Sequence, residues 1–204
     1  MVKMTSKICR CMALLAALAL LALPALAAEP QEKPMSAEEK AMMDAMMKAA
    51  TPGKQHQWLS SLAGKWDFTA RFWQDPAAPP SESKGSAERS MIMGGRVMAE
   101  AVQGDFGGMP FEGYGLTGYD NVTGKWWGTW TDNMSTGVMM SKGSCDDQGT
   151  CTFTGEYADP MSGQMKTSKM VSKHQGDTEQ HEMFEMRDGK EVKTMELVYA
   201  RRKM

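Results

Sequence analysis

The chain has 204 residues, of which 42% are hydrophobic and 24% are charged, and its formal net charge is −2. This length suits a single domain that buries its own core without help from a structural metal. A near-neutral charge gives no general attraction to nucleic acids or anionic membranes, so we expect neither as a partner. Two features of the composition can be interpreted only from where the residues lie in the sequence: the 22 methionines and the four cysteines.

The first 27 residues are typical of a secretory signal peptide. Lys3, Lys7 and Arg10 precede an apolar run from Met12 to Leu23, and small residues follow up to Ala27. The run is shorter than the roughly 20 residues that a membrane span needs, so we expect no stable membrane insertion. We therefore predict a periplasmic or secreted protein that is cleaved near Ala27. Cleavage removes three basic residues and no acidic one, which changes the formal net charge from −2 to −5.

Cys145 and Cys151 are the cysteines that remain after this cleavage, because Cys9 and Cys11 belong to the predicted signal peptide. Two cysteines in an oxidising compartment most simply form a disulfide. Turn-forming residues separate the pair, so the two side chains are expected to face each other across a hairpin. A redox pair or a soft-metal site is the alternative, but no histidine lies close in the sequence, and the structural disulfide is favoured.

The segment that follows divides into a leader and a helical part. Residues 28–35 are polar and contain prolines, which is typical of a flexible leader. Residues 36–62 are expected to be helical: Ser36 and Glu39 form a capping box, and a second short helix covers 55–62. The first helix carries methionines four residues apart, which places them on one apolar stripe.

Residues 63–204 change to a period of two. The alternation from Trp66 to Phe72 predicts a half-buried strand, and the prolines after it predict a loop. Turns rich in Gly, Asp and Asn then separate further short strands. These are expected at 84–93, 95–104, 111–120, 125–132, 137–145, 151–157, 164–174, 178–186 and 191–201. Ten strands joined by hairpins favour an all-β, closed antiparallel meander barrel, which leaves no edge exposed, and a β-sandwich is the alternative.

Several short motifs follow one another in an order that resembles a known family. They are Ala50-Thr51-Pro52-Gly53, Leu62-Ala63-Gly64-Lys65-Trp66-Asp67, Met93-Gly94-Gly95-Arg96, Gly108-Met109-Pro110-Phe111-Glu112-Gly113, Gly118-Tyr119-Asp120-Asn121, Gly128-Thr129-Trp130-Thr131-Asp132 and Gly155-Glu156-Tyr157-Ala158-Asp159-Pro160. Together they look like the bacterial domain-of-unknown-function family fifteen seventy-nine, over nearly all of the mature chain. The resemblance implies a bacterial source and a lipocalin-like (calycin) barrel, and it brings no established activity.

Gly64 and Trp66, after a short helix and at the start of the first strand, are similar to the G-x-W motif of lipocalins. In that superfamily the Trp closes one end of the barrel beneath an Arg of the last strand. Arg201 or Arg202 lies where this partner is expected, and a guanidinium can stack on an indole ring. The role of these residues would be structural.

The three histidines are His56, His174 and His181. The last two flank a predicted hairpin and could ligate a metal with Glu179 or Glu182, and His181 is also the candidate ligand for a haem. Their spacing matches no known site, so we predict neither a metal nor a cofactor. The sequence contains no nucleophile elbow, metalloprotease motif or phosphate loop. A non-catalytic protein is therefore favoured, and an enzyme without a recognisable motif is the alternative.

Glycines alternate with large aromatic residues in two of the predicted strands, which leaves room for aromatic rings or for an apolar ligand. A barrel of this size can hold one small ligand in its interior. We therefore predict a module that binds a small apolar ligand and is gated by the 36–50 helix. The predicted contacts are Phe111, Tyr114, Trp127, Trp130, Met43 and Met47. The sequence carries no signal for an oligomeric state.

The methionine excess supplies a different hypothesis, because 19 of the 22 methionines remain after removal of residues 1–27. Thioethers bind Cu(I) and react with oxidants, so a soft-metal (copper) or oxidant buffer is the alternative function. We favour the simpler interpretation that methionine is an adaptable filler of the core, with the helical stripe lying over a barrel mouth.

Overall fold

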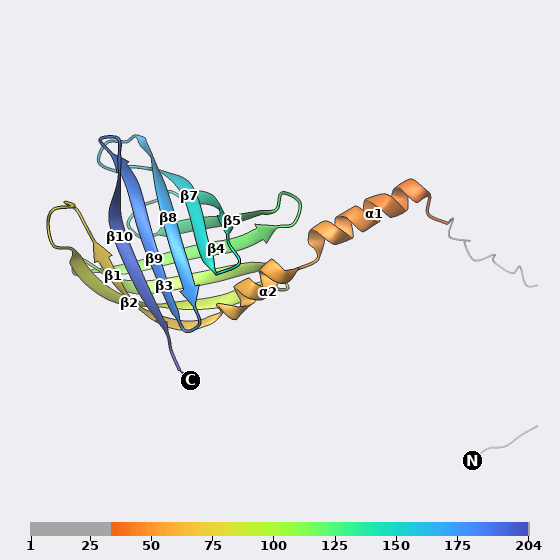
Figure 1. Ribbon diagram of the computed structural model, residues 1–204, viewed down its shortest axis with the longest axis horizontal. Helices are drawn as coiled ribbons and strands as arrows, with labels where there is room; N and C mark the ends of the chain where they lie inside the picture. Colours follow the sequence, from red (N-terminus) through yellow and green to blue (C-terminus); the bar gives the residue numbers. More distant parts are fainter. Residues whose placement is uncertain (1–33, 204) are drawn as a thin grey trace, which may run out of the picture.

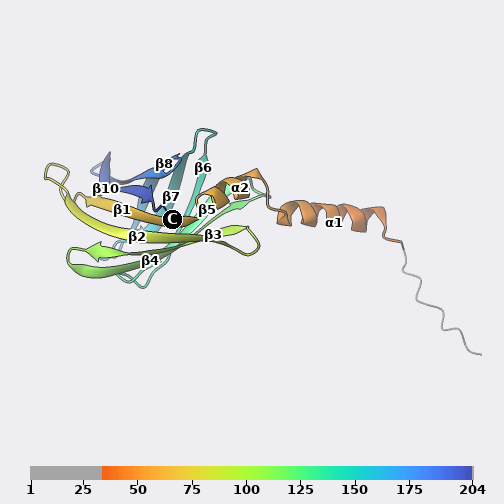
Figure 2. The same ribbon diagram turned by 90° about the horizontal axis from the view of Figure 1, so that it is seen from below.

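The structure is a computed structural model that describes residues 34–203, so the predicted signal peptide and most of the leader lie outside it. Two helices, α1 (Ala37–Ala50) and α2 (Lys54–Ser61), precede ten strands (Figures 1 and 2). The strands are β1 (Gly64–Phe72), β2 (Ser81–Ile92), β3 (Val97–Phe106), β4 (Met109–Asp120), β5 (Lys125–Asp132), β6 (Met139–Cys145), β7 (Thr150–Ala158), β8 (Met165–Gln175), β9 (Thr178–Arg187) and β10 (Lys190–Arg201).

Every strand pairs antiparallel with the next strand in the sequence, and β10 pairs with β1 to close the barrel. The predicted closed meander barrel is confirmed, and the sandwich alternative is wrong. Predicted strand ends lie within three residues of the observed ones, because turn residues fix them. Asp188 and Gly189, for example, both have positive φ, at 50° and 73°, as a two-residue hairpin turn requires.

α2 packs against one end of the barrel and fills it. Leu59 and Leu62 are buried there against Met98, Trp126 and Phe153, which point inward from β3, β5 and β7. Side chains alternate across each strand, so this end of the interior is packed by apolar residues from several strands. We call it the α2 end of the barrel.

α1 does not cover the barrel. It leads away from the barrel in both views, and none of its residues is buried (Figures 1 and 2). Its C-terminal end is held by hydrogen bonds from Arg96 to the carbonyl of Ala50 and from Asn121 to that of Thr51. The expectation of a helix lying over the barrel mouth is therefore corrected: the short α2 occupies that position. Within residues 34–203, no helix combines the length and apolar character needed to cross a membrane.

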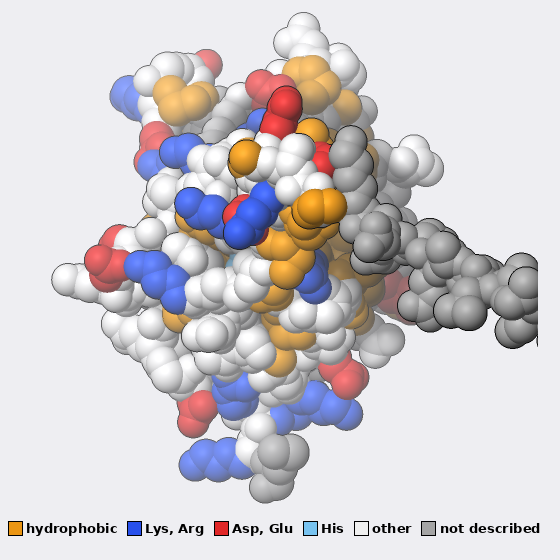
Figure 3. All heavy atoms as spheres, turned by 90° about the vertical axis from the view of Figure 1, so that its right-hand side faces the viewer, with side chains coloured by type: hydrophobic (Ala, Val, Ile, Leu, Met, Phe, Trp, Pro, Cys, Tyr) orange, Lys and Arg blue, Asp and Glu red, His pale blue; other side chains and the backbone are white. Residues whose placement is uncertain are grey.

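The methionines lie mostly on the surface. Of the 18 methionines in the described part of the chain, 12 are exposed and Met98 alone is buried. Met42, Met43, Met46 and Met47 of α1 are each at least 50% exposed. Hydrophobic side chains gather along the middle of the molecule when it is viewed from the side of α1 (Figure 3). The interpretation of methionine as core filler is therefore wrong for most of these residues.

Trp66 is fully buried at the α2 end, where its indole N–H donates to the carbonyl of Leu62. The guanidinium of Arg201 lies 4.3 Å from the Trp66 ring centroid and donates to the carbonyls of Ser61 and Ala63. Arg202 instead points outward and pairs with the exposed carboxylate of Asp67. Of the two predicted partners, Arg201 is therefore the one that links the last strand to α2 and β1.

The two arginines provide a matched test of this closure. We expect Arg201→Met to lower the free energy of unfolding by about 2 kcal/mol, because two charge-assisted hydrogen bonds and the stacking on Trp66 are lost. Arg202→Met removes only an exposed ion pair, so its effect on the free energy of unfolding should be much smaller than that of Arg201→Met. Urea denaturation followed by tryptophan fluorescence measures both. Equal losses in the two variants would contradict this role of Arg201.

Candidate functional site inside the barrel

A buried arginine lies at the centre of a polar cluster inside the barrel. Arg89 of β2 is only 4% exposed, and its guanidinium lies 4.9 Å from the ring centroids of both Trp66 and Tyr199. Its Nε donates to Glu100 at 2.7 Å, and its Nη1 lies 2.8 Å from both carboxylate oxygens of Glu179. Arg89 thereby links β2 to the neighbouring β3. It also links β2 to β9, which is separated from β2 by β1 and β10 in the sheet.

Two histidines complete this cluster on the β8–β9 hairpin. His181 Nε2 lies 3.2 Å from Glu179 Oε2, and its ring packs against Tyr199. His174 Nδ1 lies 3.3 Å from Glu179 Oε1, yet this buried nitrogen has no hydrogen-bond partner. Trp58 of α2 packs edge-on against His174, with ring centroids 5.1 Å apart. The sequence analysis named both histidines, and the structure brings them together around Glu179.

Burial and charge act in opposite directions on these groups. Burial by itself would raise the pKa of Glu179, but His174, His181 and Arg89 outweigh it and hold that pKa well below its usual value. Burial lowers the pKa of His181, which favours the neutral imidazole. For Arg89, the two carboxylates overcome the cost of burial and raise its pKa further. The cluster therefore holds two carboxylates, one guanidinium and two imidazoles in a largely buried place.

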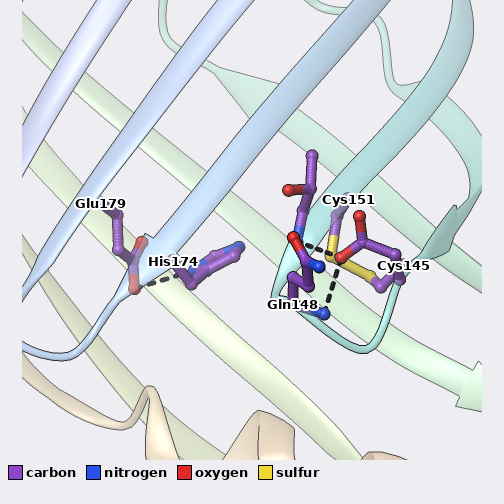
Figure 4. Close-up of a disulfide and its surroundings, with 7 residues drawn as sticks. Cys145, Gln148, Cys151, His174 and Glu179 are labelled. Atoms are coloured by element: carbon purple, nitrogen blue, oxygen red, sulfur yellow. Dashed lines mark hydrogen bonds and ion pairs between the residues drawn. A yellow bond between two sulfur atoms is a disulfide. The ribbon is translucent and has the colours of Figure 1, made fainter.

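The predicted disulfide is confirmed and lies beside this cluster. Cys145 and Cys151 are opposite each other on β6 and β7, with Cα atoms 3.9 Å apart. Figure 4 shows the disulfide at the base of its hairpin, with His174 pointing toward Glu179 on the neighbouring strands. The backbone N–H of His174 donates to the carbonyl of Gly149, so the disulfide-bonded turn also supports the end of β8. A disulfide is consistent with an extracellular or periplasmic protein.

The predicted ligand contacts do not share one cavity. Phe111 and Trp130 point inward and stack with their ring centroids 6.5 Å apart. Trp127 lies on the outer face, where its ring covers Gly118, and Tyr114 is 47% exposed. Residues an odd number of positions apart in a strand point to opposite faces, so Trp127 and Trp130 cannot both contact a ligand inside the barrel. Met43 and Met47, on the exposed α1, also lie outside the interior.

An outer cleft of about 250 Å³ lies where the end of α1 meets the barrel. Ala50, His56, Arg96, Tyr119, Asn121 and Trp127 are among its lining residues. Met47 belongs to a neighbouring, more open depression. Trp127 and Met47 are thus close to this junction of helix and barrel. They lie outside the barrel interior, where the sequence analysis expected them to contact a ligand.

A row of apolar side chains crosses the interior from the α2 end of the barrel toward the opposite end. Phe72, Met195, Met183, Met170 and Phe153 are paired in turn across β1, β10, β9, β8 and β7, so they share the inner face. Phe153 is buried, but the other four are only half-buried although they point into a closed barrel. These four inward-facing side chains therefore keep part of their apolar surface accessible.

Sequence reasoning missed three members of the polar cluster: Arg89, Glu100 and Tyr199. A signal for Arg89 was present, because it shares a strand face with Ala87 and therefore interrupts an apolar face with a charge. Charged residues are rarely buried without a partner, so such a position predicts a buried ion pair. Its partner Glu179 lies 90 residues away in the sequence, and no local pattern could have identified it.

The cluster predicts a large and specific loss of stability. Arg89→Met should lower the free energy of unfolding by about 3–5 kcal/mol, because it leaves the buried Glu179 and the partly buried Glu100 without their cation. The double variant Arg89→Met/Glu179→Gln should recover part of this loss, since one of those charges is then neutral. Urea denaturation of the wild type, the two single variants and the double variant gives the interaction free energy between Arg89 and Glu179. Strictly additive effects would contradict a direct interaction.

Comparison with known proteins agrees with this fold. A family model described as "Protein of unknown function (DUF1579)" matches residues 51–201. No protein with a curated description matches the chain. The crystal structure of Rv2717c from M. tuberculosis is similar with a TM-score of 0.57, over 75% of this chain and 100% of that chain, at 13% sequence identity. At this identity the likeness supports the fold alone. The match to the family model covers most of the chain, and the protein belongs to the DUF1579 family of proteins of unknown function.

Proposed function

We propose that the protein is a non-catalytic module that binds a small apolar ligand inside the barrel, along the inner row of apolar side chains. The observation that carries this proposal is the half-buried inner row formed by Phe72, Met195, Met183 and Met170. Burying these side chains against a ligand would remove apolar surface from water, which is favourable. Methionine is flexible and polarisable, so a row of three adapts to ligands of different shape.

The charges inside the barrel favour an uncharged ligand over a fatty-acid anion. Arg89, the buried arginine of the interior cluster, is already bound by Glu100 and Glu179 and has no free charge for a ligand carboxylate. Farther along the barrel, the hydroxyl of Tyr157 donates to Glu185 at 2.8 Å, which places another carboxylate on the inner face. An anionic head group would meet negative charge at both places.

We place this function outside the cytoplasm, in the periplasm or the extracellular medium. The Cys145–Cys151 disulfide supports this location, because disulfides persist in oxidising compartments. The basic and apolar pattern of residues 1–27, which lie outside the described residues, is the second argument.

Two methionines of β9 offer a matched test of the interior site. Met183 faces the inner row, whereas Met186 is 61% exposed on the outside. The uncharged dye N-phenyl-1-naphthylamine should bind with increased fluorescence, and Met183→Gln should weaken its binding about tenfold by placing an unpaired amide in the apolar site. Met186→Gln should bind like the wild type.

Competition with dodecanol and dodecanoate then tests the preference for uncharged ligands. Dodecanol should displace the dye at a lower concentration than dodecanoate. No dye binding, or equal effects of the two substitutions, would refute the interior site. Better competition by dodecanoate would refute the electrostatic argument alone.

A second candidate function is an oxidant buffer, and the exposure of the α1 methionines favours it. Met42, Met43, Met46 and Met47 are 50–66% exposed, and their oxidation to sulfoxide is reversible by dedicated reductases. Because no residue of α1 is buried, sulfoxides there would leave the barrel core undisturbed.

This candidate predicts an order of oxidation. With increasing hydrogen peroxide, peptide mass spectrometry should find sulfoxide first on the exposed methionines, with the four of α1 among them, and last on Met98, which is 6% exposed. The thermal midpoint should stay unchanged during the first phase. A variant with the four α1 methionines replaced by Leu should lose the part of the first phase that belongs to α1 and keep the barrel intact. Unfolding that accompanies the first oxidation events would contradict a buffering role.

A further inference from the structure

The β8–β9 hairpin brings three metal-ligand side chains to one place inside the barrel. His174 and Glu179 are direct cross-strand partners, and His181 lies two residues after Glu179, on the same strand face. The ligand atoms of all three lie within 4.8 Å of one another. The close spacing arises from the pairing of the two strands, which is why it matches no linear motif.

The donor set suits a particular class of ion. Imidazole nitrogens with one carboxylate are ligands of zinc and of other first-row divalent ions, and sites with three protein ligands keep a fourth position open. The His174 and His181 side chains are 12% and 14% exposed, so the place is enclosed but still accessible to an ion.

An unpaired nitrogen and the balance of charges in the cluster also favour a bound cation. His174 Nδ1 is buried, directed at Glu179, and has no hydrogen-bond partner. Glu100 and Glu179 carry two carboxylates against the single guanidinium of Arg89. Among residues 34–203, no other lysine or arginine lies within ion-pair distance of either carboxylate. A cation bound at the histidines would supply a partner for the nitrogen and balance the charge.

Arg89 does not compete for this place. Its Nη1 lies 2.8 Å from both oxygens of Glu179, and each carboxylate oxygen can accept more than one interaction. Ligating carboxylates in metal sites are commonly hydrogen-bonded by a neighbouring group that fixes their orientation. Arg89 would have that positioning role here.

We propose that His174, Glu179 and His181 form a binding site for a first-row divalent metal ion, with zinc as the preferred ion. His174 binds through Nδ1, His181 through Nε2, and Glu179 through one carboxylate oxygen. This site uses none of the residues of the methionine row, although Met183 lies two residues beyond His181 on the same strand face. Zinc binding and dye binding are measured separately, so either proposal can hold without the other.

The first experiment is a zinc titration of the full exported chain after dialysis against EDTA, in competition with a chromophoric chelator. We expect one zinc ion per chain. His181→Gln and His174→Gln should each weaken binding by roughly 100-fold or more, because losing a ligand costs at least as much as losing a residue that only orients one. The matched control is Glu182→Gln, because Glu182 is an adjacent carboxylate on β9 that pairs with Lys193 instead. Its zinc affinity should equal that of the wild type.

A second measurement uses the wild-type protein alone, in case a histidine variant does not fold. The chain has three histidines, and His56, whose Nδ1 accepts from the N–H of Gly53, serves as an internal reference. In nitrogen-detected NMR at constant pH, zinc should shift His174 Nδ1 and His181 Nε2 and leave His56 unchanged.

Three results would overturn the proposal. The first is the absence of stoichiometric zinc binding. The second is binding that Glu182→Gln weakens as much as His181→Gln does. The third is that the signals of His174 and His181 respond to acidification and not to zinc. A proton on an imidazole, rather than a metal ion, would then balance the negative charge of the cluster.

Discussion

Arg89 holds the barrel together from the inside. Its ion pair with Glu179 joins β2 to β9 and so spans β1 and β10, the strands whose pairing closes the sheet. Trp66 of β1 and Tyr199 of β10 lie on either side of the same guanidinium. A charge can remain in this place only because two carboxylates and two aromatic faces surround it, and removal of either kind of partner exposes the cost of its burial.

The same interaction limits what the interior can bind. An interior arginine would ordinarily suit a carboxylate ligand, but Arg89 is already paired with Glu100 and Glu179. The cluster has two carboxylates and only one guanidinium, so it favours a further cation over an anion. A metal cation near the histidines and an uncharged apolar ligand beyond them are therefore compatible with one barrel. The two proposed sites would use different chemistry: nitrogen and oxygen donors near α2, and thioethers with aromatic rings along the inner row.

The two helices differ in what they contribute to the fold: α2 packs into the barrel, whereas α1 remains exposed. α2 is short and fills one end of the barrel with Leu59 and Leu62, so it contributes to the core. α1 is longer and capped at Ser36, but it buries nothing, and its methionines remain exposed. Hydrophobic periodicity alone indicates that a helix has an apolar face, and it does not indicate whether the rest of the chain covers that face.

The sequence by itself determined the elements and their order, because alternation, glycine turns such as Asp188-Gly189 and the capping box at Ser36 are local signals. It also determined the disulfide, since Cys145 and Cys151 face each other across one short hairpin. The sequence identified His174, His181 and Glu179 only as neighbours of a turn, and it placed Trp127 and Trp130 in one site although they lie on opposite faces. Only the tertiary structure decided which face points inward, which of Arg201 and Arg202 covers Trp66, and that Arg89 meets Glu179 90 residues away. The reason is physical: the closure of the sheet sets which distant strands share the interior, and a buried charge selects its partner through that shared space.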